Sequence, residues 1–175
     1  MPATDSALEA VRLIVVMGVS GAGKSTVGSA LADKIGVSFI DADHLHPKAN
    51  VEKMRGGKPL ADEDRWPWLE RVAQAMVNAA DQNGRVVCAC SSLRYAYRAF
   101  LRQKAGEAIC FVLLNGDKST IARRQADRPG HFMPAALLDS QFATLEPFQA
   151  DECALTMDVE MELAEIVEKI AKSIG

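Results

Sequence analysis

One octapeptide determines how this chain folds: Gly18-Val19-Ser20-Gly21-Ala22-Gly23-Lys24-Ser25. Its Gly-x-x-x-x-Gly-Lys-Ser pattern is typical of a loop that wraps around phosphate groups, provided that a buried strand precedes it and a helix follows. The apolar run Leu13–Met17 comes directly before it and has the character of a strand buried on both faces. Apolar residues then recur every four positions from Val27 to Ile35, and Gly36 follows, as in a helix with a glycine stop. The sequence therefore predicts a strand, a phosphate loop (P-loop) and a helix, in this order.

The residue types in this loop suit a nucleoside triphosphate. Gly21 and Gly23 lack a β-carbon, so the backbone can approach phosphate groups closely and turn its amide N–H groups toward them. Lys24 can supply positive charge to the β- and γ-phosphates, and the Ser25 hydroxyl can ligate Mg²⁺. A glycine-rich turn with a surface lysine is the alternative. The predicted ATP-binding residues of this segment are Gly18, Ser20, Gly21, Ala22, Gly23, Lys24, Ser25 and Thr26.

Strand-like and helix-like segments alternate along the rest of the chain, which is typical of a parallel sheet covered on both faces. We therefore expect one kinase-sized domain over 1–175, with a three-layer α/β/α P-loop NTPase fold and a central five-stranded parallel sheet. Residues 1–10 are expected to form a loose N-terminus, and about 119–133, which carry an arginine cluster, are expected to form a lid. The later strands are predicted at 37–40, 85–90, 108–114 and 155–157.

The composition narrows the class of protein. Of the 175 residues, 49% are hydrophobic and 25% are charged, which is ordinary for a globular domain and excludes a disordered or fibrous chain. The formal net charge of −3 argues against a nucleic-acid-binding protein. No apolar run approaches the roughly 20 residues that a membrane span needs. No secretory signal is apparent, so the four cysteines are expected to stay reduced in a cytoplasmic protein without nucleic-acid or membrane partners.

Two aspartates, Asp41 and Asp43, follow the second predicted strand. The carboxyl ends of parallel strands face the ligand crevice, so both side chains can approach the phosphate loop. One carboxylate could order Mg²⁺, and the other could take the proton of an acceptor hydroxyl. A solvated turn is the alternative, because aspartate is common after strands.

Further short motifs follow the phosphate loop. They are Asp41–Pro47, Asn50–Met54, Gly57–Leu60, Asp62–Leu69, Cys90–Leu93 with Tyr97-Arg98, Gly130–Phe132 and Gln141–Glu146. Together with the loop they resemble the gluconokinases of the shikimate-kinase-like group, over about residues 13–146. Ala42 and Arg94 depart from this pattern, since the family often has glycine and lysine there. The chain after Glu146 matches the pattern poorly, which leaves the adenine pocket unassigned.

The resemblance implies a reaction and the residues that perform it. The γ-phosphate of ATP would pass to the 6-hydroxyl of D-gluconate, with Mg²⁺ as cofactor and with a homodimer as the assembly. By similarity, Asp41 would order Mg²⁺ with Ser25, and Asp43 would contact the acceptor hydroxyl. The lid would bring Arg124 and Arg128 to the phosphates, so that the implied catalytic residues are Lys24, Asp43, Arg124 and Arg128.

Gluconate is a polyhydroxylated anion, so its pocket needs an arginine for the carboxylate and hydrogen-bonding groups for the hydroxyls. Arg65 is the implied carboxylate ligand, although it could instead pair with Glu63 or Asp62 on the surface. A solvated helix face explains Lys53 and Arg98 equally well. The predicted acceptor-binding residues are Asp43, Lys53, Arg65, Ser91, Ser92, Arg98, His131 and Gln141.

Two other functions stay open at this point. One is a kinase for another small hydroxylated acceptor, such as shikimate or a nucleoside. The other is a nucleotide-binding module without catalysis, which the presence of both Lys24 and Asp43 disfavours.

Overall fold

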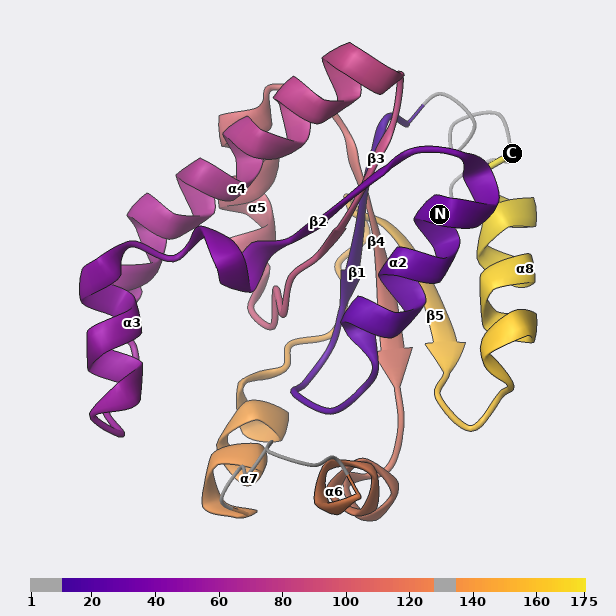
Figure 1. Cartoon of the computed structure of the whole chain (residues 1–175). Coiled ribbons are helices and arrows are strands. Elements are labelled where there is room, and N and C mark those ends of the chain that lie inside the picture. The colour runs from indigo at the N-terminus through magenta and orange to yellow at the C-terminus, as the bar shows by residue number, and fades with distance from the viewer. Residues whose placement is uncertain (1–10, 128–134) are drawn as a thin grey trace.

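The computed structural model describes residues 11–127 and 135–175, and a sheet of five parallel strands forms its centre (Figure 1). The strands lie in the order β2-β3-β1-β4-β5, so the strand before the phosphate loop, β1, is the middle one. The predicted α/β/α P-loop fold and its five-stranded parallel sheet are confirmed. The strands are β1 (Leu13–Met17), β2 (Ser38–Asp41), β3 (Val86–Ala89), β4 (Ile109–Asn115) and β5 (Cys153–Asp158).

Helices cover both faces of this sheet. The pair α2 and α8 packs on one face, and the pair α4 and α5 packs on the other. Helices α6 and α7 lie beyond the carboxyl ends of the strands (Figure 1). The helices are α2 (Lys24–Ile35), η1, a 3-10 helix (Ala42–Leu45), α3 (Lys48–Arg55), α4 (Asp62–Asn83), α5 (Tyr95–Ala105), α6 (Lys118–Ala126), α7 (Ala135–Thr144) and α8 (Leu163–Ser173).

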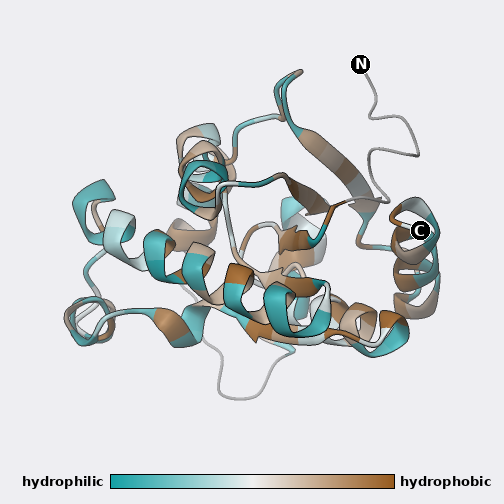
Figure 2. Ribbon diagram, turned by 90° about the horizontal axis from the view of Figure 1, so that it is seen from above, coloured by the Kyte–Doolittle hydropathy of each residue, from teal (hydrophilic) through white to brown (hydrophobic). Residues whose placement is uncertain are grey.

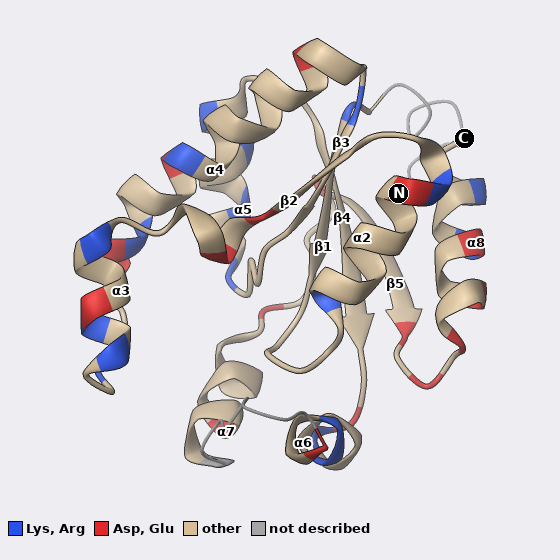
Figure 3. Ribbon diagram, viewed as in Figure 1, with Lys and Arg blue, Asp and Glu red and all other residues tan. Residues whose placement is uncertain are grey.

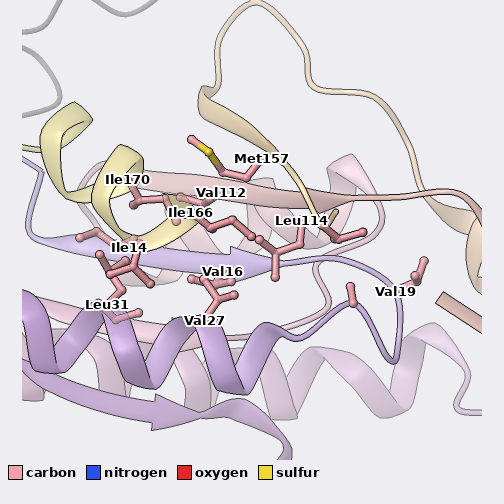
Figure 4. Packing of buried hydrophobic residues seen from close by; sticks show 14 of the residues in the cluster. Ile14, Val16, Val19, Val27, Leu31, Val112, Leu114, Met157, Ile166 and Ile170 are labelled. Carbon is pink, nitrogen blue, oxygen red and sulfur yellow. The ribbon is translucent and has the colours of Figure 1, made fainter. Parts of the chain in front are cut away.

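The side chains of β1 alternate between two apolar cores, as the period of a strand requires. Ile14 and Val16 pack toward α2 and α8, where Val27, Leu31 and Ile166 meet them (Figure 4). The remaining side chains of β1 pack toward α4 and α5. Hydropathy colouring shows the same layering, with hydrophobic strands in the middle and helices that alternate hydrophobic and hydrophilic residues (Figure 2). Burial on both faces explains why β1 is apolar throughout.

Two predicted segments lie partly or wholly outside the described residues. The loose N-terminus over 1–10 is outside them, and so are residues 128–133 of the predicted lid. The described part of that lid, 119–127, belongs almost entirely to helix α6. Within the described residues, no helix combines the length and the apolar character that crossing a membrane requires.

Arg98 corrects one of the predictions. Its side chain is fully buried, and its guanidinium pairs with the equally buried Glu152 at 2.6 Å. The other guanidinium donors reach backbone carbonyls on both sides, those of Ser92 and Leu93 at 3.0 and 3.2 Å and those of Glu146 and Pro147 at 3.3 and 3.2 Å. Neither acceptor binding nor a solvated helix face describes this residue. Arg98 joins the turn after β3 to the segment that leads into β5.

We predict that Glu152→Gln destabilises the fold by about 3–5 kcal/mol, because it leaves the Arg98 guanidinium buried without a counter-ion. Urea denaturation monitored by circular dichroism measures this change. Glu168→Gln is the matched control: Glu168 pairs with Lys34 at 2.7 Å, but its side chain is 45% exposed, so water replaces the lost partner. Equal stability of the two variants would contradict the structural role of Arg98.

Candidate active site

The phosphate loop connects β1 to α2 in a conformation that needs glycine. Gly21 and Gly23 have φ values of 85° and 95°, in the left-handed region that other residues rarely adopt. Helix α2 begins directly after Gly23, so its N-terminal amide groups and the positive end of its dipole lie at the loop. Lys24 Nζ donates to the Val19 carbonyl oxygen at 3.0 Å, which places the lysine across the loop. The start of α2 and the Lys24 side chain thus lie together at the loop that is predicted to bind phosphates.

Asp41 links this loop to the second predicted aspartate. It is the last residue of β2, and its two carboxylate oxygens have different partners. Oδ2 accepts a hydrogen bond from Ser25 Oγ at 2.9 Å, and Oδ1 accepts one from the backbone N–H of Asp43 at 3.0 Å. The second bond caps η1. The acidic segments after β2 and the basic start of α2 lie at the same edge of the sheet (Figure 3). The structure therefore brings Ser25, Asp41 and Asp43 together.

Ser25 and Asp41 suit a Mg²⁺ ion that is shared with a phosphate ligand. Mg²⁺ prefers oxygen donors and usually binds through one or two protein groups, substrate phosphates and water. The hydroxyl and carboxylate oxygens of these residues, 2.9 Å apart, are donors of this kind. No group of three or more His, Cys, Asp and Glu side chains that could hold a metal occurs in residues 11–127 and 135–175. The residues present fit an ion that is held jointly by the protein and by ATP.

Trp68 of helix α4 supports the segment that carries Asp43. Its Nε1 donates to the Ala42 carbonyl oxygen at 2.7 Å, and its ring stacks on His46 with 4.1 Å between the centroids. Burial lowers the pKa of His46, so the imidazole is neutral at pH 7; the Asp43 carboxylate opposes this shift, and the Arg65 guanidinium adds to it. Asp43 and Arg65 therefore act on the same ring, and η1 and the start of α4 border one site.

The turn after β3 lies beside the phosphate loop. The Ser91 carbonyl oxygen accepts a hydrogen bond from the Gly18 N–H at 3.3 Å. Ser92 is buried and has a φ of 49°, which is uncommon for a residue with a side chain. Burial raises the pKa of the preceding Cys90 thiol to about 11, and the charges of Asp43 and Lys24 also act on it. The hydrogen bond from Gly18 thus places the predicted acceptor turn beside the phosphate loop.

Two predicted acceptor ligands make ion pairs at the start of α4. Lys53 Nζ lies 2.6 Å from Asp64 Oδ2, which also accepts a hydrogen bond from the Ala61 N–H at 2.8 Å. Arg65 Nη1 lies 3.4 Å from Asp62 Oδ1. The sequence had offered an ion pair of Arg65 with Glu63 or Asp62 as an alternative to acceptor binding, and the structure contains the pair with Asp62.

Gln141 of helix α7 contacts the phosphate loop. Its Oε1 accepts a hydrogen bond from the Ser20 N–H at 2.6 Å. This predicted acceptor ligand therefore lies directly against the phosphate loop. The other two predictions in this part of the chain, Arg128 and His131, lie outside the described residues.

One further feature was not predicted from the sequence, a cavity of about 370 Å³ beside the phosphate loop. It is lined by the loop residues 21–23, by Thr26 and Arg124, and by the connection between β5 and α8, residues 159–163. The Arg124 guanidinium donates to the Val159 carbonyl oxygen at 2.6 Å, which ties α6 to this connection. The cavity is contiguous with the phosphate loop, which supplies part of its lining. A signal for it did exist, because the connection follows the last parallel strand at the ligand-binding edge.

Comparisons with known proteins identify the family. A family profile described as shikimate kinase matches residues 20–174. The thermosensitive gluconokinase of Escherichia coli (strain K12) is 44% identical over 161 residues, which cover 91% of this chain and 86% of the relative. The chain belongs to the gluconokinases of the shikimate kinase family. The gluconokinase of Gluconobacter oxydans (strain 621H) is 42% identical to this family member over 163 residues, 92% of this chain and 90% of the relative.

A solved gluconokinase has the same fold. The gluconokinase from Sinorhizobium meliloti 1021, known from a crystal structure, is 44% identical in sequence to this gluconokinase family member. The two structures superpose with a TM-score of 0.82, and the match covers 93% of this chain and 90% of that one. A sugar kinase from Janibacter sp. HTCC2649 is 40% identical and has a TM-score of 0.83, covering 94% and 98%. The fold and the kinase class of this chain are thus established together.

We predict that Gly21→Ala lowers the affinity for ATP at least tenfold, because the added β-carbon is strained at this φ and overlaps the Gln125 side chain. Titration with a fluorescent ATP analogue measures the affinity. Gly84→Ala is the matched control, since Gly84 has the same φ of 85° but open space around the added atom. It should lower stability without changing ATP affinity, and equal affinity of both variants would contradict the crowding at Gly21.

Proposed function

We propose that this gluconokinase family member transfers the γ-phosphate of ATP to the 6-hydroxyl of D-gluconate, giving 6-phosphogluconate and ADP. The observation that carries the transfer reaction is the Asp41 carboxylate, which bridges the Ser25 hydroxyl and the Asp43 amide. This bridge holds Ser25 and Asp41, the proposed Mg²⁺ ligands, together with Asp43 beside the phosphate loop. Gluconate as the acceptor is supported by relatives named gluconokinase that are 44% and 42% identical to the chain.

Asp43 is the proposed base of this reaction. Its backbone amide is fixed by Asp41, whereas the residue itself is exposed at the start of η1. A carboxylate in this position can accept the proton that the acceptor hydroxyl loses as it attacks the γ-phosphorus. Phosphoryl transfer depends mainly on positioning and charge neutralisation, so one such base suffices.

Positive groups on two sides neutralise the phosphates in this proposal. Lys24 acts from within the loop, and Arg124 acts from α6, where it lines the cavity beside the loop. We propose this cavity as the site of the ATP nucleoside. Mg²⁺, held through Ser25 and Asp41, supplies charge neutralisation at the β- and γ-phosphates when it is bound. Arg128 would join them from the lid over 119–133, on the resemblance alone.

The acceptor subsite extends from Asp43 to the start of α4. We infer that Ser91 and Ser92 border it on the β3 side and that Lys53 and Arg65 border it on the α3 and α4 side. Gln141 would meet it beside Ser20, and His131 would close it from the lid. Arg98 is left out, because its donors are engaged in the interior.

The proposal extends to a homodimer of single-domain subunits in the cytoplasm. The family resemblance supports the dimer. Four unpaired cysteines, three of them buried, support a reducing compartment. Light scattering after size-exclusion chromatography would test the dimer directly.

We predict that ADP release from Mg-ATP saturates with D-gluconate and stays near background with shikimate, glycerate and nucleosides. A coupled spectrophotometric assay over this panel measures it. Turnover with another acceptor would retain the kinase and reject gluconate. Absence of turnover across the panel, with ATP still bound, would favour the non-catalytic module.

We predict that Asp43→Asn lowers turnover by roughly 100-fold or more, because an amide of the same shape cannot accept the proton. ATP affinity should stay within a few-fold of wild type. Steady-state kinetics and nucleotide titration measure the two effects. Asp33→Asn, at an exposed position of α2, is the control with the same chemical change. Turnover of Asp43→Asn equal to that of the control would remove Asp43 from its proposed role.

A further inference from the structure

Two arginines share one carboxylate beside the proposed acceptor subsite. Arg65 Nη1 lies 3.4 Å from Asp62 Oδ1, and Arg94 Nη1 lies 3.6 Å from Asp62 Oδ2. The Tyr97 hydroxyl donates to Asp62 Oδ1 at 2.7 Å, which orients the carboxylate between the two guanidinium groups. Both guanidinium groups also lie over the Tyr97 ring, with 5.2 and 6.0 Å from Cζ to the ring centroid. We refer to Asp62, Arg65, Arg94 and Tyr97 as the arginine clamp.

The clamp carries an excess of positive charge. In the described part of the chain, Asp62 is the one carboxylate within ion-pair distance of Arg65 or Arg94. Burial and the hydrogen bond to Asp62 raise the pKa of the Tyr97 phenol, so it stays neutral at pH 7. Two cations and one anion leave one positive charge.

Neighbouring basic residues, in contrast, each have one carboxylate to balance their charge. Arg98 pairs with Glu152, Arg102 with Asp151 and Lys53 with Asp64, and among the described residues no second basic group lies within ion-pair distance of these three carboxylates. At 3.4 and 3.6 Å, the contacts of the clamp are also long for charge-assisted hydrogen bonds. The clamp is therefore the place in this region where one more anion would be neutralised.

The clamp is accessible and lies toward Asp43. The side chains of Arg65 and Arg94 are 28% and 45% exposed, so a solute can reach them. Trp68 of the same helix as Arg65 stacks on His46, with 4.1 Å between the ring centroids, and donates to the Ala42 carbonyl oxygen. Ala42 directly precedes Asp43, so these contacts place the start of α4 beside the proposed base. The charged segments at the start of α4 lie beside α3, on the opposite side of the molecule from α8 (Figure 3).

We propose that Arg65 and Arg94 together bind the carboxylate of the acceptor, and that Asp62 and Tyr97 orient the two guanidinium groups for it. This inference rests on the proposed function and adds Arg94, Asp62 and Tyr97 to it. A guanidinium presents a planar fork of donors that matches a carboxylate, so two forks can bind its two oxygens. The clamp then selects acceptors that carry a carboxylate at the end opposite to the reacting hydroxyl.

The experiment compares two acceptors that differ only at that end. D-Glucitol is D-gluconate with a hydroxymethyl group in place of the carboxylate. Steady-state kinetics with both acceptors are measured for wild type, Arg94→Gln and Arg65→Gln. Arg71→Gln is the matched control, because Arg71 is an exposed arginine of the same helix as Arg65 and lies outside the clamp.

We expect Arg94→Gln to raise the KM for gluconate roughly 10- to 100-fold, the usual effect of a lost charge-assisted hydrogen bond. The KM for ATP and the kcat at saturating gluconate should change little. The ratio of kcat/KM for gluconate to that for glucitol should fall by the same factor. A purely structural role would lower activity with both acceptors and leave this ratio unchanged, and that result overturns the proposal.

The acceptor preference of the wild-type enzyme tests the proposed function separately from the clamp. If wild type prefers another acceptor that carries a carboxylate, gluconate is wrong, and the same ratio is measured with that acceptor and its alcohol. If the preferred acceptor has no anionic group, or if gluconate neither reacts nor binds, the clamp is overturned as well. If wild type phosphorylates gluconate and Arg94→Gln matches Arg71→Gln, the clamp alone is wrong.

Discussion

The parallel pairing of β1 with β3 and β4 is the constraint on which the whole site depends. Because all five strands run in one direction, their carboxyl ends meet at one edge, and the phosphate loop leaves from the middle of it. The register places Asp41 opposite Ala89, and Ala89 opposite Val16. The end of β2 therefore lies level with the end of β1, and Asp41 reaches Ser25. A slip of β2 by one residue would turn the Asp41 side chain to the other face of the sheet and break this contact.

Charge is distributed in two ways around this edge. Arg98 is fully buried, and its charge is matched by Glu152, as the cost of burying an ion demands. The Lys24 ammonium and the Arg65 and Arg94 guanidinium groups lie instead where phosphates and a carboxylate would bind. Both substrates of the proposed reaction are anions, so in this proposal the three cations neutralise them, and the carboxylates of Asp41 and Asp43 serve the metal and the proton. The same residue type thus has a structural role in the interior and a binding role at the edge.

How far the sequence predicts this molecule depends on how local each feature is. The strand, loop and helix at 13–35 and the pair Asp41 and Asp43 could be predicted, because spacing within a short segment fixes them. The role of Arg98 could not, since its partner Glu152 lies 54 residues away and either residue alone is compatible with the surface. The cavity beside the phosphate loop could not be predicted, because residues 159–163 line it through their position after β5, which needs no particular motif. The contact of Gln141 with Ser20 could not be predicted either, because it spans 121 residues of sequence.

These long-range contacts belong to one segment that touches both halves of the site. At its start, Gln141 accepts a hydrogen bond from the Ser20 N–H of the phosphate loop at 2.6 Å. Five residues later, the Glu146 N–H donates to the Leu93 carbonyl oxygen at 2.8 Å, in the turn after β3. Arg98 then joins that turn to the same segment through the Glu146 carbonyl and the Glu152 carboxylate. Phosphoryl transfer needs the acceptor hydroxyl in line with the γ-phosphate, so the spacing of loop and turn matters to the reaction. Because the segment from Gln141 to Glu152 contacts both, it sets that spacing, and its motif at 141–146 is explained by this position in the fold.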